Sequence, residues 1–199
     1  MAKIIQFPLN PAPEKFGLQR VVKKKEKESR KPGQLNLFTG GKVIKLNQLS
    51  IFDEALLLDE HGDTKKARQC YQKAIQENDC AADAYCNLGI IESQEGNYPK
   101  AIDCFTLSLK VNPRHYEAHY NLANLYAEVG NQGLAKVHYG IAIELEPDFP
   151  NSYFNLGLTL AVNREYREAV DNLKKYRDLT PSEEHNQTDD LIAKLSITL

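Results

Sequence analysis

The sequence predicts an all-α fold, a solenoid of stacked helix-turn-helix repeats that ends in a C-terminal capping helix. Segments that begin at residues 48, 82, 116 and 150 superimpose with a period of 34 residues, and each contains two amphipathic stripes with helical spacing. An amphipathic stretch follows the last of these segments. A fixed period of about 20 to 50 residues is typical of proteins in which each unit buries its apolar face against its neighbours.

The charged residues divide the chain between Asn47 and Gln48. Residues 1–47 contain 11 Lys or Arg residues against 3 acidic residues, a charge of +8. Of the chain's 25 basic and 27 acidic residues, 14 and 24 therefore lie after Asn47, a charge of −10. We expect a basic, mostly disordered tail over residues 1–47, followed by an acidic, folded body.

A short motif lies within the expected tail. Residues 34–38 (QLNLF) resemble the pentapeptide by which bacterial replication and repair proteins dock on the sliding DNA clamp, and the resemblance points to Gln34, Leu35, Leu37 and Phe38 as clamp-binding residues. The alternative is that these apolar side chains fold back over the first repeat. The tail contains no helix-turn-helix pattern, so we expect no specific nucleic-acid partner.

The next element in the chain is a series of four repeats, which we expect at residues 48–81, 82–115, 116–149 and 150–183. The string YCNLG at residues 85–89 recurs as HYNLA at residues 119–123 and as YFNLG at residues 153–157. Apolar residues at i, i+3 and i+4 in each first half, and at i, i+4, i+7 and i+8 in each second half, predict two helices per repeat.

One position of the 34-residue frame marks the turn between the two helices of a repeat. Gly62, Gly96 and Gly130 share this position, and Gly is the residue that most easily adopts the positive φ of a helix C-terminus. The fourth repeat has Arg164 there. Earlier in each first helix, small residues such as Gly89 and Gly157 are expected to face the alanines of the second helix, where a bulky side chain would separate the pair.

The last element is a helix expected at residues 184–199. Leu191, Ile192 and Leu195 share one side of such a helix and are expected to cover the open end of the fourth repeat.

These residues resemble the tetratricopeptide repeat of bacterial type, with its signature of an aromatic residue, Leu-Gly, Ala, a second aromatic residue, Ala and Pro. The resemblance covers residues 48–183, with Glu92 in place of the usual aromatic residue late in one first helix. It implies a protein-interaction adaptor without catalytic activity, which binds a protein or an extended peptide on the concave side, lined by the first helices.

Asparagines recur on that expected lining at intervals of 34 residues. Asn87, Asn121 and Asn155 each have a side-chain amide that both donates and accepts hydrogen bonds, and such amides can pair with the main chain of a peptide whatever its sequence. The alternative is that they bond neighbouring repeats to one another. The further candidate partner-binding residues on this lining are Asn124, Asp83, Glu117, Tyr120 and Phe154.

The charge of the expected lining favours a basic or neutral ligand. It contains several carboxylates and no Lys or Arg, whereas repeats that hold the C-terminal carboxylate of heat-shock chaperones use basic residues there. The chain's own basic tail is one candidate ligand. The alternative is that the acidic side chains form only a solvated face.

Patterns typical of enzymes and of metal sites are missing from the sequence. We find no glycine-rich phosphate loop, nucleophile elbow or HExxH motif, and the four cysteines have neither CxxC spacing nor a suitable histidine. His115 and His119 are interpreted as structural residues. We expect no cofactor, no bound metal, no membrane partner and a cytoplasmic location. The leading hypothesis is an adaptor, and the alternative is an accessory factor tethered to the sliding clamp.

Overall fold

The computed structural model describes residues 18–22 and 49–197, and within these residues it contains helices and no strand. The all-α prediction is therefore confirmed for the part of the chain that is described. In the described residues four helix pairs follow one another along the chain, and α10 closes the series. The pairs are α2 (Ile51–Glu60) and α3 (Thr64–Gln76), α4 (Ala81–Gln94) and α5 (Tyr98–Val111), α6 (Tyr116–Glu128) and α7 (Gln132–Leu145), and α8 (Pro150–Val162) and α9 (Tyr166–Leu179). The short 3-10 helix Ser182–Glu184 and α10 (His185–Ser196) follow them.

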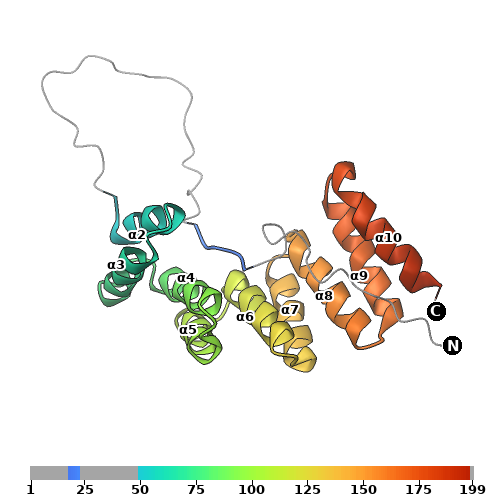
Figure 1. Ribbon diagram of the computed structural model, residues 1–199, viewed down its shortest axis with the longest axis horizontal. Coiled ribbons are helices and arrows are strands. Elements are labelled where there is room, and N and C mark those ends of the chain that lie inside the picture. Colours follow the sequence, from blue (N-terminus) through green and yellow to red (C-terminus); the bar gives the residue numbers. More distant parts are fainter. Residues whose placement is uncertain (1–17, 23–48, 198–199) are drawn as a thin grey trace, which may run out of the picture.

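The helix pairs stack side by side in one row from α2 to α10 (Figure 1). Each first helix packs on its own second helix, and each second helix packs on the first helix of the next pair. The first helices also contact one another directly, α4 with α6 and α6 with α8. The first helices of successive repeats therefore lie next to one another along the row.

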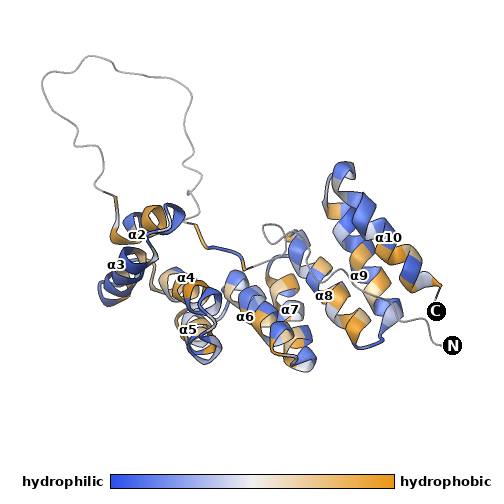
Figure 2. Cartoon of the chain, viewed as in Figure 1, coloured by the Kyte–Doolittle hydropathy of each residue, from blue (hydrophilic) through white to orange (hydrophobic). Residues whose placement is uncertain are grey.

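The core lies between the helices of each pair and between successive pairs. Apolar and hydrophilic colour alternate along the helices (Figure 2), and the buried apolar side chains form clusters that join successive helices. One position of the 34-residue frame supplies a large buried side chain in every repeat, namely Tyr71, Phe105, Tyr139 and Leu173. The 34-residue period of the sequence therefore corresponds to a core position that recurs in each repeat.

Helix α2 begins at a double cap. The Oγ of Ser50 accepts a hydrogen bond from the backbone N–H of Asp53 at 3.1 Å, and Oδ2 of Asp79 accepts one from the backbone N–H of Phe52 at 2.9 Å. N–H groups in the first turn of a helix have no partner within the helix and are stabilised by such side chains. Asp79 occupies the place of the usual proline, and this bond gives it a structural role.

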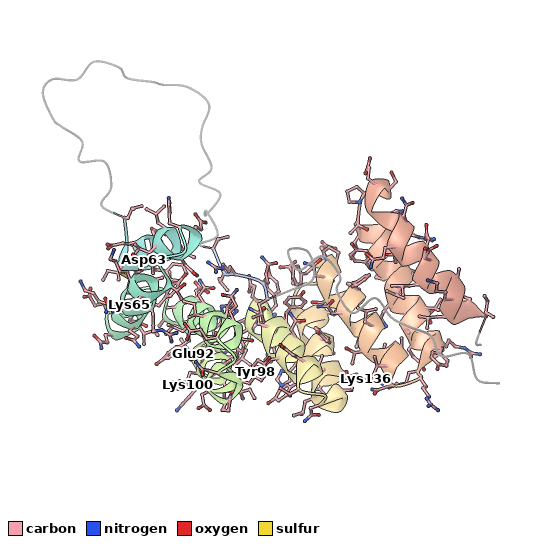
Figure 3. All side chains as sticks on the ribbon, viewed as in Figure 1. Asp63, Lys65, Glu92, Tyr98, Lys100 and Lys136 are labelled. Atoms are coloured by element: carbon pink, nitrogen blue, oxygen red, sulfur yellow. The ribbon has the colours of Figure 1, made fainter. Side chains whose placement is uncertain are left out.

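Glu92, where the repeat signature has an aromatic residue, is buried on α4 and is labelled in Figure 3. Its carboxylate pairs with the guanidinium of Arg68 from α3, and it accepts a hydrogen bond from Nδ2 of Asn97 at 3.0 Å. The first two repeats are therefore joined here by an ion pair instead of by apolar packing. Buried carboxylates require such partners because their desolvation is costly.

The turn residues have the backbone conformation that the sequence predicts. Gly62, Gly96 and Gly130 have φ values of +77°, +77° and +82°, and Arg164 at the same frame position has a φ of +64°. All four residues therefore adopt the left-handed conformation, although a side chain makes it unfavourable at Arg164. The fourth turn has the same geometry as the others without the glycine.

Replacing Arg164 with glycine is expected to raise the free energy of unfolding by about 0.5–1 kcal/mol, because glycine removes the steric cost of a positive φ. The matched control is Gly96→Ala, which adds a side chain to the same turn of the second repeat and is expected to lower stability by about 1 kcal/mol. Urea unfolding followed by circular dichroism measures both. A loss of stability in Arg164→Gly would contradict this explanation of the turn.

The C-terminal helix covers the last repeat as expected. Leu191 and Leu195 of α10 are buried in one apolar cluster with Tyr176 of α9, and Ile192 packs against that cluster. Tyr176 occupies a frame position where the earlier repeats have the small residues Ala74, Ser108 and Ala142. The large ring fits because α10, and not another repeat, packs on α9.

Candidate functional site

Residues 18–22 lie against the first helices of the second and third repeats. Figure 1 shows them as an extended blue segment that runs past α4 and α6. Tyr98 and Lys136, which belong to second helices and are labelled in Figure 3, lie along the opposite edge of the helix row. We call residues 18–22 the tail segment and the side of α2, α4 and α6 that bears Asp59, Asn87 and Asn121 the asparagine face.

Two asparagines of this face each bind one residue of the tail segment through its main chain. Asn121 Oδ1 accepts from the backbone N–H of Gln19 at 2.6 Å, and Asn121 Nδ2 donates to the Gln19 carbonyl at 2.8 Å. Asn87 forms the same pair of bonds with Val21, at 2.9 Å to the N–H and 3.0 Å to the carbonyl. Each amide thus satisfies both polar groups of one peptide residue without reading its side chain.

Both amides are buried and held in place by further bonds. Asn87 Nδ2 also donates to the hydroxyl of Tyr71 at 3.2 Å, and Asn121 Nδ2 donates to Sγ of Cys86 at 3.4 Å. Neither asparagine has any exposed side-chain area in the presence of the tail segment. The orientation of the two amides is therefore fixed by the repeats, and a ligand meets donors and acceptors that are already placed.

A carboxylate on the same face binds the cation of the tail segment. Nη1 of Arg20 lies 2.6 Å from Oδ2 of Asp59, which is only 3% exposed. The hydroxyl of Tyr71 donates to the same carboxylate at 3.3 Å. Burial raises the pKa of Asp59, and Arg20 opposes the rise without cancelling it. A buried carboxylate needs a cationic partner, and here the tail segment supplies it.

An apolar contact completes the site. Val21 is 5% exposed and belongs to a cluster with residues of α4, α5 and α6, and Leu18 packs against the same cluster. The neighbouring Val22 is 59% exposed. The side-chain amide of Gln19 bonds only to the adjacent carbonyl of Arg20, at 3.4 Å. The face therefore contacts side chains at positions 18, 20 and 21 and main chain at positions 19 and 21.

The third asparagine of the series makes bonds between repeats. Nδ2 of Asn155 donates to the hydroxyl of Tyr120 at 3.0 Å and to Oδ1 of Asn124 at 2.8 Å. Phe154 is buried and packs on Tyr176 with ring centroids 5.0 Å apart. In the described residues Asn155 thus joins the fourth repeat to Tyr120 and Asn124 of the third, and Phe154 packs within the fourth repeat. Their direct contact with a partner stays a prediction.

The two acidic candidates lie on either side of a buried histidine. Nε2 of His115 lies 2.8 Å from Asp83, and Nδ1 lies 3.3 Å from Glu117. Burial by itself would lower the pKa of His115, but the hydrogen bonds and charges of Asp83 and Glu117 outweigh it and raise the pKa to about 9. The raised pKa favours the protonated ring, whose charge would offset part of the negative charge expected here.

His115 and His119, which the sequence places four residues apart, have different partners. Nδ1 of His119 lies 2.9 Å from Nδ1 of His138, and burial lowers the pKa of both, that of His138 to about 4. Among the residues that the structure describes, no group of three or more His, Cys, Asp or Glu side chains is placed to hold a metal ion. The same residues include no helix with the length and apolarity that a bilayer crossing requires.

The proposed clamp-binding motif at residues 34–38 lies outside the described residues and stays a prediction from the sequence.

The sequence interpretation missed Asp59 and did not specify which part of the tail is bound. Asp59 lies four residues after Ala55 and three after Leu56, on the expected lining side of α2, and this spacing was a usable signal. Leu18, Arg20 and Val21 lie in a stretch without periodicity or a recognisable motif. No local signal distinguishes them from the rest of the tail.

The comparisons with known proteins agree with this architecture. The tetratricopeptide repeat pattern matches residues 82–115, and a second tetratricopeptide repeat pattern matches residues 104–136 and 138–171. No curated protein sequence matches the chain.

Solved structures with the same fold include MamA AMB-1, with a TM-score of 0.62, 20% identity, and coverage of 74% of this chain and 80% of that one. The first TPR of Spaghetti (RPAP3) bound to the HSP90 peptide SRMEEVD has a TM-score of 0.55, 20% identity, and coverage of 59% and 91%. The TPR2B-domain:pHsp70-complex of yeast Sti1 has a TM-score of 0.54, 21% identity, and coverage of 59% and 98%.

Proposed function

We propose that this chain, which is built of tetratricopeptide repeats, is an adaptor whose asparagine face binds an extended segment of another protein. The observation that carries the proposal is the pair of main-chain contacts made by Asn87 and Asn121. A face that presents a donor and an acceptor to every second residue of an extended chain suits a peptide ligand, because successive pairs of N–H and carbonyl groups point to the same side.

The charge of the face supports a ligand with at least one cation. Asp59 is buried, and the guanidinium of Arg20 is a cation that pairs with it in the described residues. The HSP90 peptide SRMEEVD of the similar structure has three acidic residues, so its charge is opposite to that of the tail segment. We therefore propose a basic or neutral partner segment and not an acidic chaperone tail.

Replacing Asn87 and Asn121 together with alanine is expected to weaken peptide binding by roughly 100-fold. Each substitution removes two hydrogen bonds to the ligand, and two bonds of about 0.7 kcal/mol each correspond to roughly tenfold in affinity. Ligands for the measurement are selected from a displayed library of random linear peptides, both on the full chain and on a chain that lacks residues 1–22. Fluorescence anisotropy then compares the affinity of each variant.

The matched control is Asn172→Ala, which removes a half-buried asparagine from the second helix α9, away from the asparagine face. It is expected to leave the affinity for the peptide unchanged. Circular dichroism of each variant checks that its helices are retained. A selection that yields no peptide, or peptides that bind the double variant as tightly as the wild type, would refute the proposed function.

A further inference from the structure

The asparagine face is already occupied by the chain's own residues. The tail segment buries Val21, pairs Arg20 with Asp59 and uses both main-chain pairs offered by Asn87 and Asn121. A partner segment that binds the same two asparagines has to displace it, since each amide has one carbonyl oxygen and its N–H groups already have two acceptors.

We propose that the tail segment is an internal ligand that competes with the partner, and that the partner segment has the same chemistry: an apolar residue, any residue, Arg or Lys, then an apolar residue. This proposal rests on the proposed function and names its ligand class and its regulation. The four positions correspond to Leu18, Gln19, Arg20 and Val21.

Each position of this ligand follows from a contact or from an exposed side chain. The first and fourth positions are apolar because Leu18 and Val21 pack on the cluster of α4, α5 and α6. The third is a cation because Arg20 pairs with the buried Asp59 carboxylate. A ligand without a cation at this position would leave that carboxylate without a counter-ion, which costs binding free energy. The second is the least restricted because the hydrogen bonds of Gln19 to the face come from its main chain.

The internal occupant has an advantage that comes from its tether. Residues 23–48 separate the tail segment from the start of the repeats, and a chain of this length spans up to about 90 Å when fully extended. The segment and the face belong to one chain, and for a flexible linker of this length the effective concentration is on the order of millimolar. A free peptide that binds with a dissociation constant of about 10–100 μM would then appear roughly 10- to 100-fold weaker than its intrinsic affinity.

The competition is tested on the full-length chain with a fluorescein-labelled peptide that contains the sequence of residues 18–22 flanked by glycines. Arg20→Glu combined with Val21→Asp places a carboxylate opposite Asp59 and another in the apolar cluster, so it releases the tail segment. We expect this release variant to bind the probe at least 10-fold more tightly than the wild type. Adding Asn87→Ala and Asn121→Ala to the release variant is expected to abolish binding.

The matched control combines Gln19→Glu with Val22→Asp. It adds negative charge at Gln19, whose side-chain amide bonds to the adjacent Arg20 carbonyl, and at the exposed Val22. It is expected to bind the probe as weakly as the wild type.

Two altered probes test the ligand chemistry on the release variant. A probe with glutamate in place of Arg20, or with a methyl group on the amide nitrogen of Val21, is expected to lose at least 10-fold in affinity.

Three results would overturn the inference. If the wild type and the release variant bind the probe with equal affinity, the tail segment does not compete. The proposed function would still hold in that case, provided that probe binding depends on Asn87 and Asn121. If library-selected peptides bind but the probe does not, only the ligand chemistry is rejected. If neither the probe nor any library peptide binds, the proposed function is rejected as well. A wild-type dimer in light scattering that the release variant abolishes would make a second copy the occupant.

Discussion

Replacing Gly89 with alanine is expected to lower the free energy of unfolding by about 1–3 kcal/mol, although alanine favours helix over glycine by about 1 kcal/mol. A Cβ atom at this position of α4 would lie 2.7 Å from Cε1 and 2.8 Å from Cδ1 of Phe105. The Phe105 ring is fully buried in the cluster that also contains Val21, so moving it would disturb the surrounding packing. The close approach of α4 and α5 therefore requires glycine.

The matched control for this substitution is Gly140→Ala in α7. No heavy atom of a neighbouring group lies within 4 Å of a Cβ built there, so only the helix propensity changes. We expect this variant to be more stable by up to about 1 kcal/mol. Urea unfolding distinguishes the two substitutions by the sign of their effect, and a gain of stability in both would show that α4 and α5 tolerate a larger separation.

The free energy of unfolding is expected to decrease as the pH rises from about 6.5 to about 9, and His115 is the main cause. Its pKa is raised from 6.5 to about 9 by Asp83 and Glu117, which outweigh the effect of burial. A histidine whose folded pKa lies above the unfolded value stabilises the fold fully below pH 6.5, and this stabilisation is lost as the pH rises through about 9. The difference corresponds to about 3 kcal/mol.

Urea unfolding at a series of pH values measures this dependence, and His115→Gln is expected to flatten it. His61→Gln, at the exposed C-terminal end of α2, serves as the control and is expected to retain the slope. His138 does not interfere because its pKa is lowered to about 4, so its effect on stability lies below pH 6.5 and has the opposite sign. An unchanged slope in His115→Gln would refute the assignment.

The sequence alone determined the repeated part of the fold. The period of 34 residues located both helices of each repeat, the glycine turns and the shared large core position occupied by Tyr71, Phe105, Tyr139 and Leu173. These features are local or recur at a fixed interval, so each copy supports the interpretation of the others. Asn87 and Asn121 became candidates for the same reason, since their spacing places them at equivalent positions of successive helices.

The tertiary structure alone decided how those positions are used. Asn121 is 102 residues from Gln19, Asn87 is 66 residues from Val21, and His115 is 32 residues from Asp83. Pairings across such distances depend on how the helices stack and where the tail returns, and no periodic signal in the sequence encodes them. The repeats therefore predicted a face that binds main chain, and only the packed chain showed that its own residues occupy it.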